Sequence, residues 1–306
     1  MNAIPKGLPF DPSQLQGLSE KLLRSHHQNN YGGAVKRLNA IRSELRQSQP
    51  GAMPGFELNG LKREELIATN SMLLHELYFD SLAGSSQEMV SAMALALAGS
   101  FGSVERWREE FVAMGKALGG GSGWVLLSFQ PREGSLVNQW AADHTHALAG
   151  GTAILALDMY ERAYHMDHGA AAGAYVDAFM VHIDWSKVYE RYQQAVHAAS
   201  EGCAADLTQL ELSKQVVIDV RRDAMFEQAQ PMLPGARWRD PAKVSDWAGE
   251  LPRDDEVLVY CIYGHEVGRS TAMKLRAMGV KASYLPGGID AWAAAGKPLQ
   301  AKEGQR

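Results

Sequence analysis

The sequence has 306 residues, of which 46% are hydrophobic and 21% are charged, and its formal net charge is −5. This length predicts two domains of ordinary size, each with its own core. The modest negative charge gives no reason to expect nucleic acid or an anionic membrane as a partner. No apolar run approaches the roughly eighteen residues of a spanning helix, and the first residues lack the pattern of a secretory signal. The two cysteines, Cys203 and Cys261, form no disulfide framework and favour a reducing compartment, with the cytoplasm as the expected location.

The first two hundred residues predict mainly helices. Apolar residues recur at three- and four-residue spacing from Ser19 to Leu45, and Ser19 is a suitable N-cap. A Pro- and Gly-rich break follows at residues 49–55. Further helices are expected over residues 63–82, 86–98 and 104–117.

Strands follow these helices. Gly119–Phe129 and Ser135–Trp140 predict paired strands joined by the turn PREG, and a further strand ends at Asp158. Helix is expected again through Tyr192, which makes this part an α+β arrangement of helical hairpin and small antiparallel sheet. The polar segment 200–209 predicts a domain boundary. After it, the strands VVIDV and VLVYC alternate with helices, which predicts an α/β domain with a parallel sheet.

Three residues in the first part could share one metal ion. His26 and His75 lie on expected helices, and Asp158 lies at an expected strand end. A carboxylate beside two imidazoles suits iron or manganese. Residue type alone is weak evidence, because a histidine on a helix is more often a solvated or core residue.

Several segments of this part resemble the iron/manganese superoxide dismutase family. They are LSEKLLRSHHQNNYGGAVKRLN, NSMLLHELYFDSL, SFGSVERWREEF, GSGWVLLSF, DMYERAYHMDHG and HIDWSKVYERY, in the family's order over nearly all of residues 1–200. The resemblance implies a dismutase-like domain at residues 1–200, one Fe or Mn ion per chain, and a homodimer formed through this domain. It also implies that two superoxide ions are converted to oxygen and hydrogen peroxide. The sequence leaves the choice between iron and manganese open.

The resemblance assigns roles position by position. His26, His75 and Asp158 match three of the family's four protein ligands, and Tyr78 matches a tyrosine that lines the site. His144 falls near the position that hydrogen-bonds the metal's solvent ligand. Tyr160 and Leu126 replace aromatic residues around the metal, and Asn30 and Ala34 replace the His and Tyr of the substrate channel, where Tyr31 could swing in.

Arg162 stands where the family has its fourth ligand. A guanidinium offers no lone pair, and at about 5 Å it repels a divalent ion by roughly 6 kcal/mol at an effective dielectric near 20. Three interpretations stay open. The site is active with three protein ligands or with His165 as a substitute; the metal is lost or weakly held; or the metal serves another role. Arg162 could also pair with Glu161 of a second chain across the dimer.

Cys261 follows the apolar strand VLVY and precedes a Gly-containing loop and a helix. Such a loop offers backbone N–H groups to an anion, and the helix dipole stabilises thiolate. The segments VVIDVRRDAMFEQAQPMLPGARW and VLVYCIYGHEVGRSTAMKLRAMGVKASYLPGGIDAWAAAGKPL resemble rhodanese-like domains. The resemblance implies a second domain at residues 207–302.

On this resemblance Cys261 is the nucleophile that takes sulfur from a sulfane-sulfur donor and passes it to a thiol acceptor. The amides of residues 262–268 would cradle the persulfide, with Arg269 near its mouth. The loop is expected to be longer than the usual six residues, and Val267, where phosphatase relatives carry Arg, argues against a phosphatase. Cys203 could resolve a persulfide on Cys261, although an incidental role is the simpler interpretation.

Three functional hypotheses follow. The first is a metal-dependent superoxide dismutase with a fused rhodanese-type sulfurtransferase. The second is a sulfurtransferase whose dismutase-like domain has lost its metal and serves as a dimerisation scaffold. The third is a non-enzymatic redox-sensing or interaction protein, against which the intact-looking Cys261 loop argues.

Overall fold

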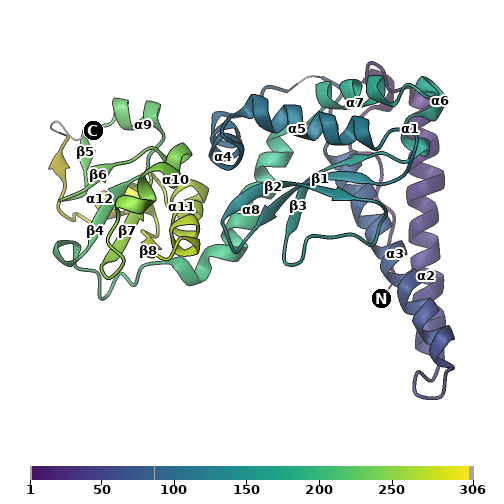
Figure 1. Cartoon of the computed structure of the whole chain (residues 1–306), viewed down its shortest axis with the longest axis horizontal. Coiled ribbons are helices and arrows are strands. Elements are labelled where there is room, and N and C mark those ends of the chain that lie inside the picture. Colours follow the sequence, from purple (N-terminus) through teal and green to yellow (C-terminus); the bar gives the residue numbers. More distant parts are fainter. Residues whose placement is uncertain (1, 86, 303–306) are drawn as a thin grey trace.

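The computed structural model describes residues 2–85 and 87–302. The chain forms an elongated two-domain molecule, with a parallel sheet and its helices at one end and a helical hairpin at the other (Figure 1). A small antiparallel sheet lies between them. The fold class predicted from the sequence is therefore confirmed.

The α-helices of the first 200 residues fall in the regions that the sequence predicted to be helical, although several of their bounds differ. They are α1 (Glu20–Ser25), α2 (Gly32–Gln47), α3 (Gly55–Asp80), α4 (Ser91–Phe101), α5 (Val104–Ala117), α6 (His165–His168), α7 (Ala172–Val181) and α8 (Trp185–Ser200). The start of α3 precedes the predicted one by eight residues. The predicted start of the third helix, residue 86, lies outside the described residues, and α4 begins at Ser91.

The first predicted helix changes its hydrogen bonding midway. Ser19 caps it as predicted, because its Oγ accepts from the amide of Leu22 at 3.1 Å. Between α1 and α2, residues His26–Tyr31 form a π-helical segment. Such segments occur often at functional sites. Here the segment begins at one of the predicted ligands.

The antiparallel sheet has the order β2-β1-β3 within the described residues. Its strands are β1 (Trp124–Gln130), β2 (Ser135–Ala141) and β3 (Thr152–Asp158). Trp124 pairs with Asp158, so the carboxyl end of β3 meets the start of β1. Every residue of β3 from Ile154 onward is buried, which fits its continuous apolar run.

The second sheet has the order β6-β4-β7-β8, and its neighbouring strands are parallel. Its strands are β4 (Val216–Asp219), β6 (Arg237–Trp238), β7 (Glu256–Tyr260) and β8 (Lys281–Tyr284). The remaining elements of this part are α9 (Asp223–Gln228), α10 (Val244–Trp247), α11 (Glu266–Ala277), α12 (Gly288–Ala294) and the paired strands β5 (Pro231–Met232) and β9 (Gln300–Ala301).

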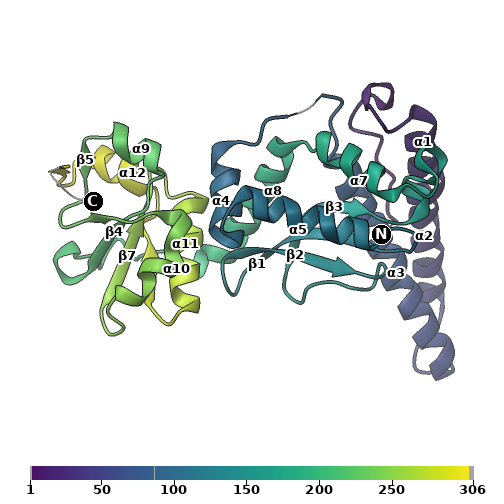
Figure 2. The ribbon, with the colours of Figure 1, turned by 45° about the horizontal axis from the view of Figure 1, so that its top comes forward.

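The two parts share one continuous apolar core, and the second part has a further core of its own. One continuous apolar cluster runs from the helices around β1 and β3 to one face of the parallel sheet, where it includes Val259 and Met273. A second cluster, including Leu258 and Trp292, covers the other face. The view in Figure 2 shows α4 and α8 facing the parallel-sheet part. The expected core of the second domain is thus present on one face of its sheet, whereas its other face joins the core of the first part, where α8 and α11 pack on each other.

No helix in the described ranges is long and apolar enough to cross a membrane.

Candidate metal and cysteine sites

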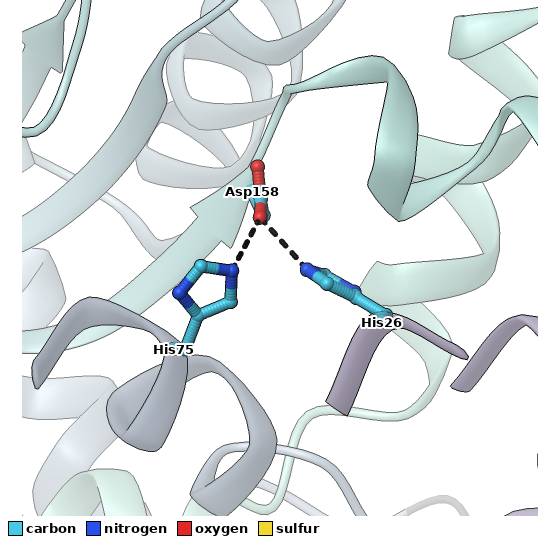
Figure 3. A group of neighbouring side chains, drawn as sticks. All are labelled: His26, His75 and Asp158. Atoms are coloured by element: carbon cyan, nitrogen blue, oxygen red, sulfur yellow. Dashed lines mark hydrogen bonds and ion pairs between the residues drawn. The ribbon is translucent and has the colours of Figure 1, made fainter. Parts of the chain in front are cut away.

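Three predicted ligands come together where α3, β3 and the π-helical segment meet. His26, His75 and Asp158 are buried, and their potential ligand atoms all lie within 4.8 Å of one another. The Asp158 Oδ2 atom lies 3.0 Å from His26 Nε2 and 3.6 Å from His75 Nε2 (Figure 3). Donors that share one ion at about 2.1 Å lie about 3.0–3.7 Å apart. These separations fit one metal ion.

The hydrogen bonding of His75 indicates where a cation would bind in this cluster. Its Nδ1 atom donates to the backbone oxygen of Ser71 at 2.6 Å, which leaves Nε2 with a lone pair facing the Asp158 carboxylate. Among the described residues, His75 Nε2 is a buried polar atom without a hydrogen-bond partner, and so is His26 Nδ1. A lone pair facing an anionic oxygen is stabilised by a cation between them, so the donor set fits iron or manganese.

The protonation states suit metal binding. Burial, followed by the charge of His26, lowers the pKa of His75 to about 3, and burial also lowers the pKa of His26. Burial favours a higher pKa for Asp158, but the Arg162 charge and the hydrogen bond from His26 outweigh it and lower that pKa. Neutral imidazoles and an ionised carboxylate are the forms that bind metal.

Two tyrosines lie beside the cluster. The Tyr78 ring centroid is 5.3 Å from that of His26. The Tyr175 hydroxyl donates to the backbone oxygen of Asp158 at 2.7 Å and lies 3.3 Å from the Tyr78 hydroxyl. Tyr78 was expected at the site, whereas Tyr175 was not, because nothing in its local sequence links it to Asp158.

A histidine–tryptophan pair lies on the other side of His75. Trp124 Nε1 donates to His144 Nδ1 at 3.0 Å, and the Trp124 ring lies edge-on to His75 with centroids 5.4 Å apart. Burial and the Arg162 charge lower the pKa of His144 to about 4. Trp124 therefore supplies an aromatic wall of the site, a role that sequence reasoning had not given it, while Leu126 lies two residues along the strand.

Arg162 points into the site. Its Nε atom lies 3.3 Å from Asp158 Oδ2, its Nη2 atom lies 3.5 Å from His144 Nε2, and its guanidinium stacks on the Tyr160 ring at 4.0 Å. Within this chain Arg162 thus pairs with Asp158, whereas the sequence had suggested Glu161 of a second chain as its partner. His165 is exposed and lies outside the ligand cluster, so it does not substitute as a ligand here.

A cavity of about 280 Å³ leads toward this site. It is lined by Asn29, Asn30, Gly33, Ala34, Arg37, Ile67, Ala68, Ser71, His144 and Arg162. Asn30 and Ala34, which were predicted to line a substrate channel, therefore line this cavity. Tyr31 does not swing in, because its hydroxyl donates to Glu76 at 3.0 Å and accepts from the amide of Lys6 at 2.7 Å.

Cys261 occupies a second cavity, of about 200 Å³. The cavity is lined by Tyr189, Arg221, Arg222, Met225, Cys261, Ile262, Tyr263, His265, Glu266 and Val267. Burial raises the pKa of the Cys261 thiol above its ordinary value of 9.0, although backbone hydrogen bonds from Gly268, His265 and Gly264 oppose this shift. The cysteine thus lies in a ring of amides, as expected of a loop that holds an anionic sulfur.

The loop is shorter than predicted. Helix α11 begins at Glu266, so six residues run from Cys261 to the first residue of the helix. Gly264 has φ +67°, and a Cβ there would lie 2.6 Å from the amide nitrogen of Gly287. A Cβ at Gly268 would lie 3.3 Å from the Cys261 sulfur. The loop is compact because glycine lets its backbone approach both the sulfur and the neighbouring turn.

Arg269 is not among the residues that line the Cys261 cavity. Its Nε atom donates to the Gly264 carbonyl at 2.8 Å, its Nη1 atom donates to Ser200 Oγ at 3.1 Å, and its guanidinium stacks on Tyr284 at 4.5 Å. Arg269 therefore braces the loop. Asp219 and Arg221 form a buried bidentate pair, in which Arg221 Nε donates to Asp219 Oδ1 and Arg221 Nη2 donates to Oδ2, as expected of a structural role.

Comparisons with known proteins found matches to both parts of the chain. Residues 89–191 match the model of the iron/manganese superoxide dismutase C-terminal domain, and residues 204–295 match the rhodanese-like domain. The chain is 63% identical over 191 residues to "Superoxide dismutase [Fe]" of Cupriavidus metallidurans, covering 62% of this chain and 96% of that protein. It is 34% identical over 199 residues to "Superoxide dismutase [Mn] 1" of Halobacterium salinarum, covering 61% and 94%.

The fold and the buried His–His–Asp cluster define a metal-dismutase type of protein with a second, cysteine-bearing domain. The chain belongs to the iron/manganese superoxide dismutase family and carries a rhodanese-like domain in addition. Its candidate metal site consists of His26, His75 and Asp158, and relatives named for iron and for manganese both occur.

Proposed function

We propose that the first domain is a metal-dependent superoxide dismutase and that the second is a rhodanese-type sulfurtransferase. The observation that carries the first half is the lone pair of His75 Nε2, buried without a hydrogen-bond partner in the described structure and aimed at Asp158 Oδ2. His26, His75 and Asp158 would hold iron or manganese. When bound, the metal supplies the one-electron oxidation and reduction that convert two superoxide ions to oxygen and hydrogen peroxide.

The protein's own residues then bring the substrate and shape the site. Arg37 and Arg162 line the cavity beside His144, and positive charge in a cleft attracts an anion such as superoxide. Tyr78 lies beside His26, and Tyr175 is hydrogen-bonded to Asp158. Burial is the main cause of the raised pKa of Tyr78, which keeps its hydroxyl protonated. His144 accepts from Trp124 through Nδ1, so its Nε2 faces the cavity side where Arg162 lies.

Arg162 favours a second candidate function for the first domain, in which this domain acts as a scaffold. Its fixed charge already neutralises Asp158, which lowers the gain from placing a metal ion beside the same carboxylate. In that case the metal is absent or weakly held, and the domain serves as a dimerisation scaffold for the sulfurtransferase.

Metal analysis of the purified full chain separates the two candidates. About one iron or manganese ion per chain, together with superoxide dismutation that is lost in His75→Ala, supports the dismutase. Protein that binds neither ion after incubation with excess Fe²⁺ or Mn²⁺, and shows no dismutation, supports the scaffold.

For the second domain we propose nucleophilic sulfur transfer by Cys261. The thiolate attacks the outer sulfur of a sulfane-sulfur donor such as thiosulfate; the new S–S bond forms as the donor's S–S bond breaks, and sulfite leaves with the electron pair. A nucleophile such as cyanide or a thiolate then takes the outer sulfur and regenerates the Cys261 thiolate. Amides of Gly264, His265 and Gly268 face the sulfur and support this role. Thiosulfate:cyanide turnover that disappears in Cys261→Ala tests it.

The division into domains at residues 1–200 and 207–302 is part of this proposal. Helix α8 ends at Ser200, and Ala205 already donates its amide to the Tyr284 carbonyl at the edge of the parallel sheet. We also propose a homodimer through the dismutase-like domain and a cytoplasmic location. Free thiols at Cys203 and Cys261 support a reducing compartment.

A further inference from the structure

Helix α8 of the dismutase-like domain presents one face to the Cys261 loop. Tyr189, Gln193, His197 and Ser200 follow one another at spacings of four, four and three residues, which places them in one stripe along the helix. All four approach the second domain. Tyr189 and Gln193 contact Glu266, the His197 ring lies 5.9 Å from that of His265, and Ser200 accepts from Arg269.

Glu266 accepts two hydrogen bonds from this stripe. It is buried and is the first residue of α11. Its Oε1 accepts from the Tyr189 hydroxyl at 2.5 Å, and its Oε2 accepts from Gln193 Nε2 at 3.1 Å. Both oxygens of the carboxylate are thus bound by side chains of the other domain.

The position of Glu266 matters because it lines the same cavity as Cys261. A buried carboxylate beside a sulfur opposes the thiolate, and it adds to the burial that raises the pKa of Cys261. Hydrogen bonds from Tyr189 and Gln193 fix the carboxylate on the α8 side, and these donors partly offset the negative charge that the sulfur meets. Tyr189 is also a wall of the cavity itself.

We propose that Tyr189 and Gln193 of the dismutase-like domain are positioning residues of the sulfur-transfer site. They hold Glu266 against α8, so that docking of the two domains tunes the reactivity of the Cys261 thiol. This inference rests on the proposed role of Cys261, but its consequence for the thiol can be measured without sulfur transfer.

Other charged or titratable groups also face the Cys261 site and have to be kept constant in such a test. They are Arg221 and Arg222 after β4, Tyr263 and His265 in the loop, His197 on α8, and Arg269 on α11.

The test measures the rate of Cys261 alkylation by iodoacetamide against pH in the full chain carrying Cys203→Ser. Tyr189→Phe and Gln193→Leu each remove one hydrogen bond to Glu266. We expect each to move the profile to higher pH by several tenths of a unit, which lowers the rate below the midpoint about two- to fivefold. Glu266→Gln should move the profile to lower pH, and adding Tyr189→Phe to it should cause no further shift.

Gln194→Ala is the matched control, since Gln194 follows Gln193 on α8 but donates to Glu190 and is not part of the stripe. Circular dichroism shows whether each variant is folded. Unchanged profiles for Tyr189→Phe and Gln193→Leu overturn the inference, and so does a Tyr189→Phe shift of equal size in the Glu266→Gln background. If the profiles shift as expected but wild-type protein transfers no sulfur, only the proposed activity fails.

Discussion

Arg162 Nε lies 3.3 Å from Asp158 Oδ2, the same oxygen that both His26 Nε2 and His75 Nε2 face. A fixed cation and a candidate metal site thus share one carboxylate oxygen. The guanidinium cannot leave this charge state, so metal binding has to proceed beside it or displace it. This relationship bears directly on metal binding by the first domain, and each residue in it can be replaced separately.

Replacing Arg162 with His should strengthen metal binding and raise dismutation about tenfold or more, because a neutral imidazole both removes the repulsion and offers a fourth ligand atom. Metal content by mass spectrometry and a superoxide assay measure the two effects. Arg37→Gln is the control, since it removes positive charge from the same cavity at a residue paired with Glu64 rather than with Asp158. A wild-type chain already holding one ion, with Arg162→His unchanged in content and rate, would contradict this prediction.

Replacing Asp158 with Asn should destabilise the fold by on the order of 3 kcal/mol, because it leaves the Arg162 charge without its buried partner. Urea unfolding of metal-free protein measures the difference. The double variant Asp158→Asn, Arg162→Gln should recover part of the loss, since it removes the stranded charge as well. Equal stability of wild type and the single variant would show that the ion pair contributes nothing.

Sulfur transfer should increase with pH through the neutral range and beyond 9. Burial raises the pKa of Cys261 above 9.0, so at pH 7 most of the protein carries the unreactive thiol, and the thiolate fraction grows as the pH rises through the raised value. The pH profile of kcat/KM for thiosulfate checks this. Cys203→Ser should leave the profile in place, because Cys203 is not among the residues lining the Cys261 cavity. A rate that is flat between pH 6 and pH 9 is the outcome that this explanation does not allow.

Gly134→Ala should loosen the contact between the domains. Gly134 lies in the turn between β1 and β2 with φ +63°, and a Cβ there would lie 2.7 Å from Met273 Cβ on α11. Gly150→Ala is the matched control, because Gly150 has φ +70° but nothing within 4 Å of the added Cβ. Both variants carry the backbone strain, of about 1 kcal/mol, whereas only Gly134→Ala adds the clash.

Thermal unfolding measures this pair of glycine variants. We expect a larger decrease in the unfolding temperature for Gly134→Ala, together with faster proteolysis of the segment 200–209. Equal losses for the two variants would mean that the turn does not press on α11.

The sequence determined the order of helices and strands and most of the candidate residues. Helix α5 was predicted at its observed bounds, and Ser19 was predicted as an N-cap, because caps and apolar periodicity act over a few neighbouring residues. The family resemblance identified four candidate residues, because each lies in a short segment that is recognisable by itself. They are His26, His75, Asp158 and Cys261.

Only the tertiary structure decided which other residues contact these candidates. Tyr175, Trp124 and Tyr189 reach the two sites from distant parts of the chain, and only the packing of α7, β1 and α8 places them there. The same holds for Arg269, which points to Ser200 rather than into the Cys261 cavity. Side-chain direction and long-range contact depend on how elements dock, and a local pattern carries no information about the partner across an interface. The sequence therefore determined two families in one chain, and the docking of α8 on α11 decided that Tyr189 of the first domain lines the Cys261 cavity of the second.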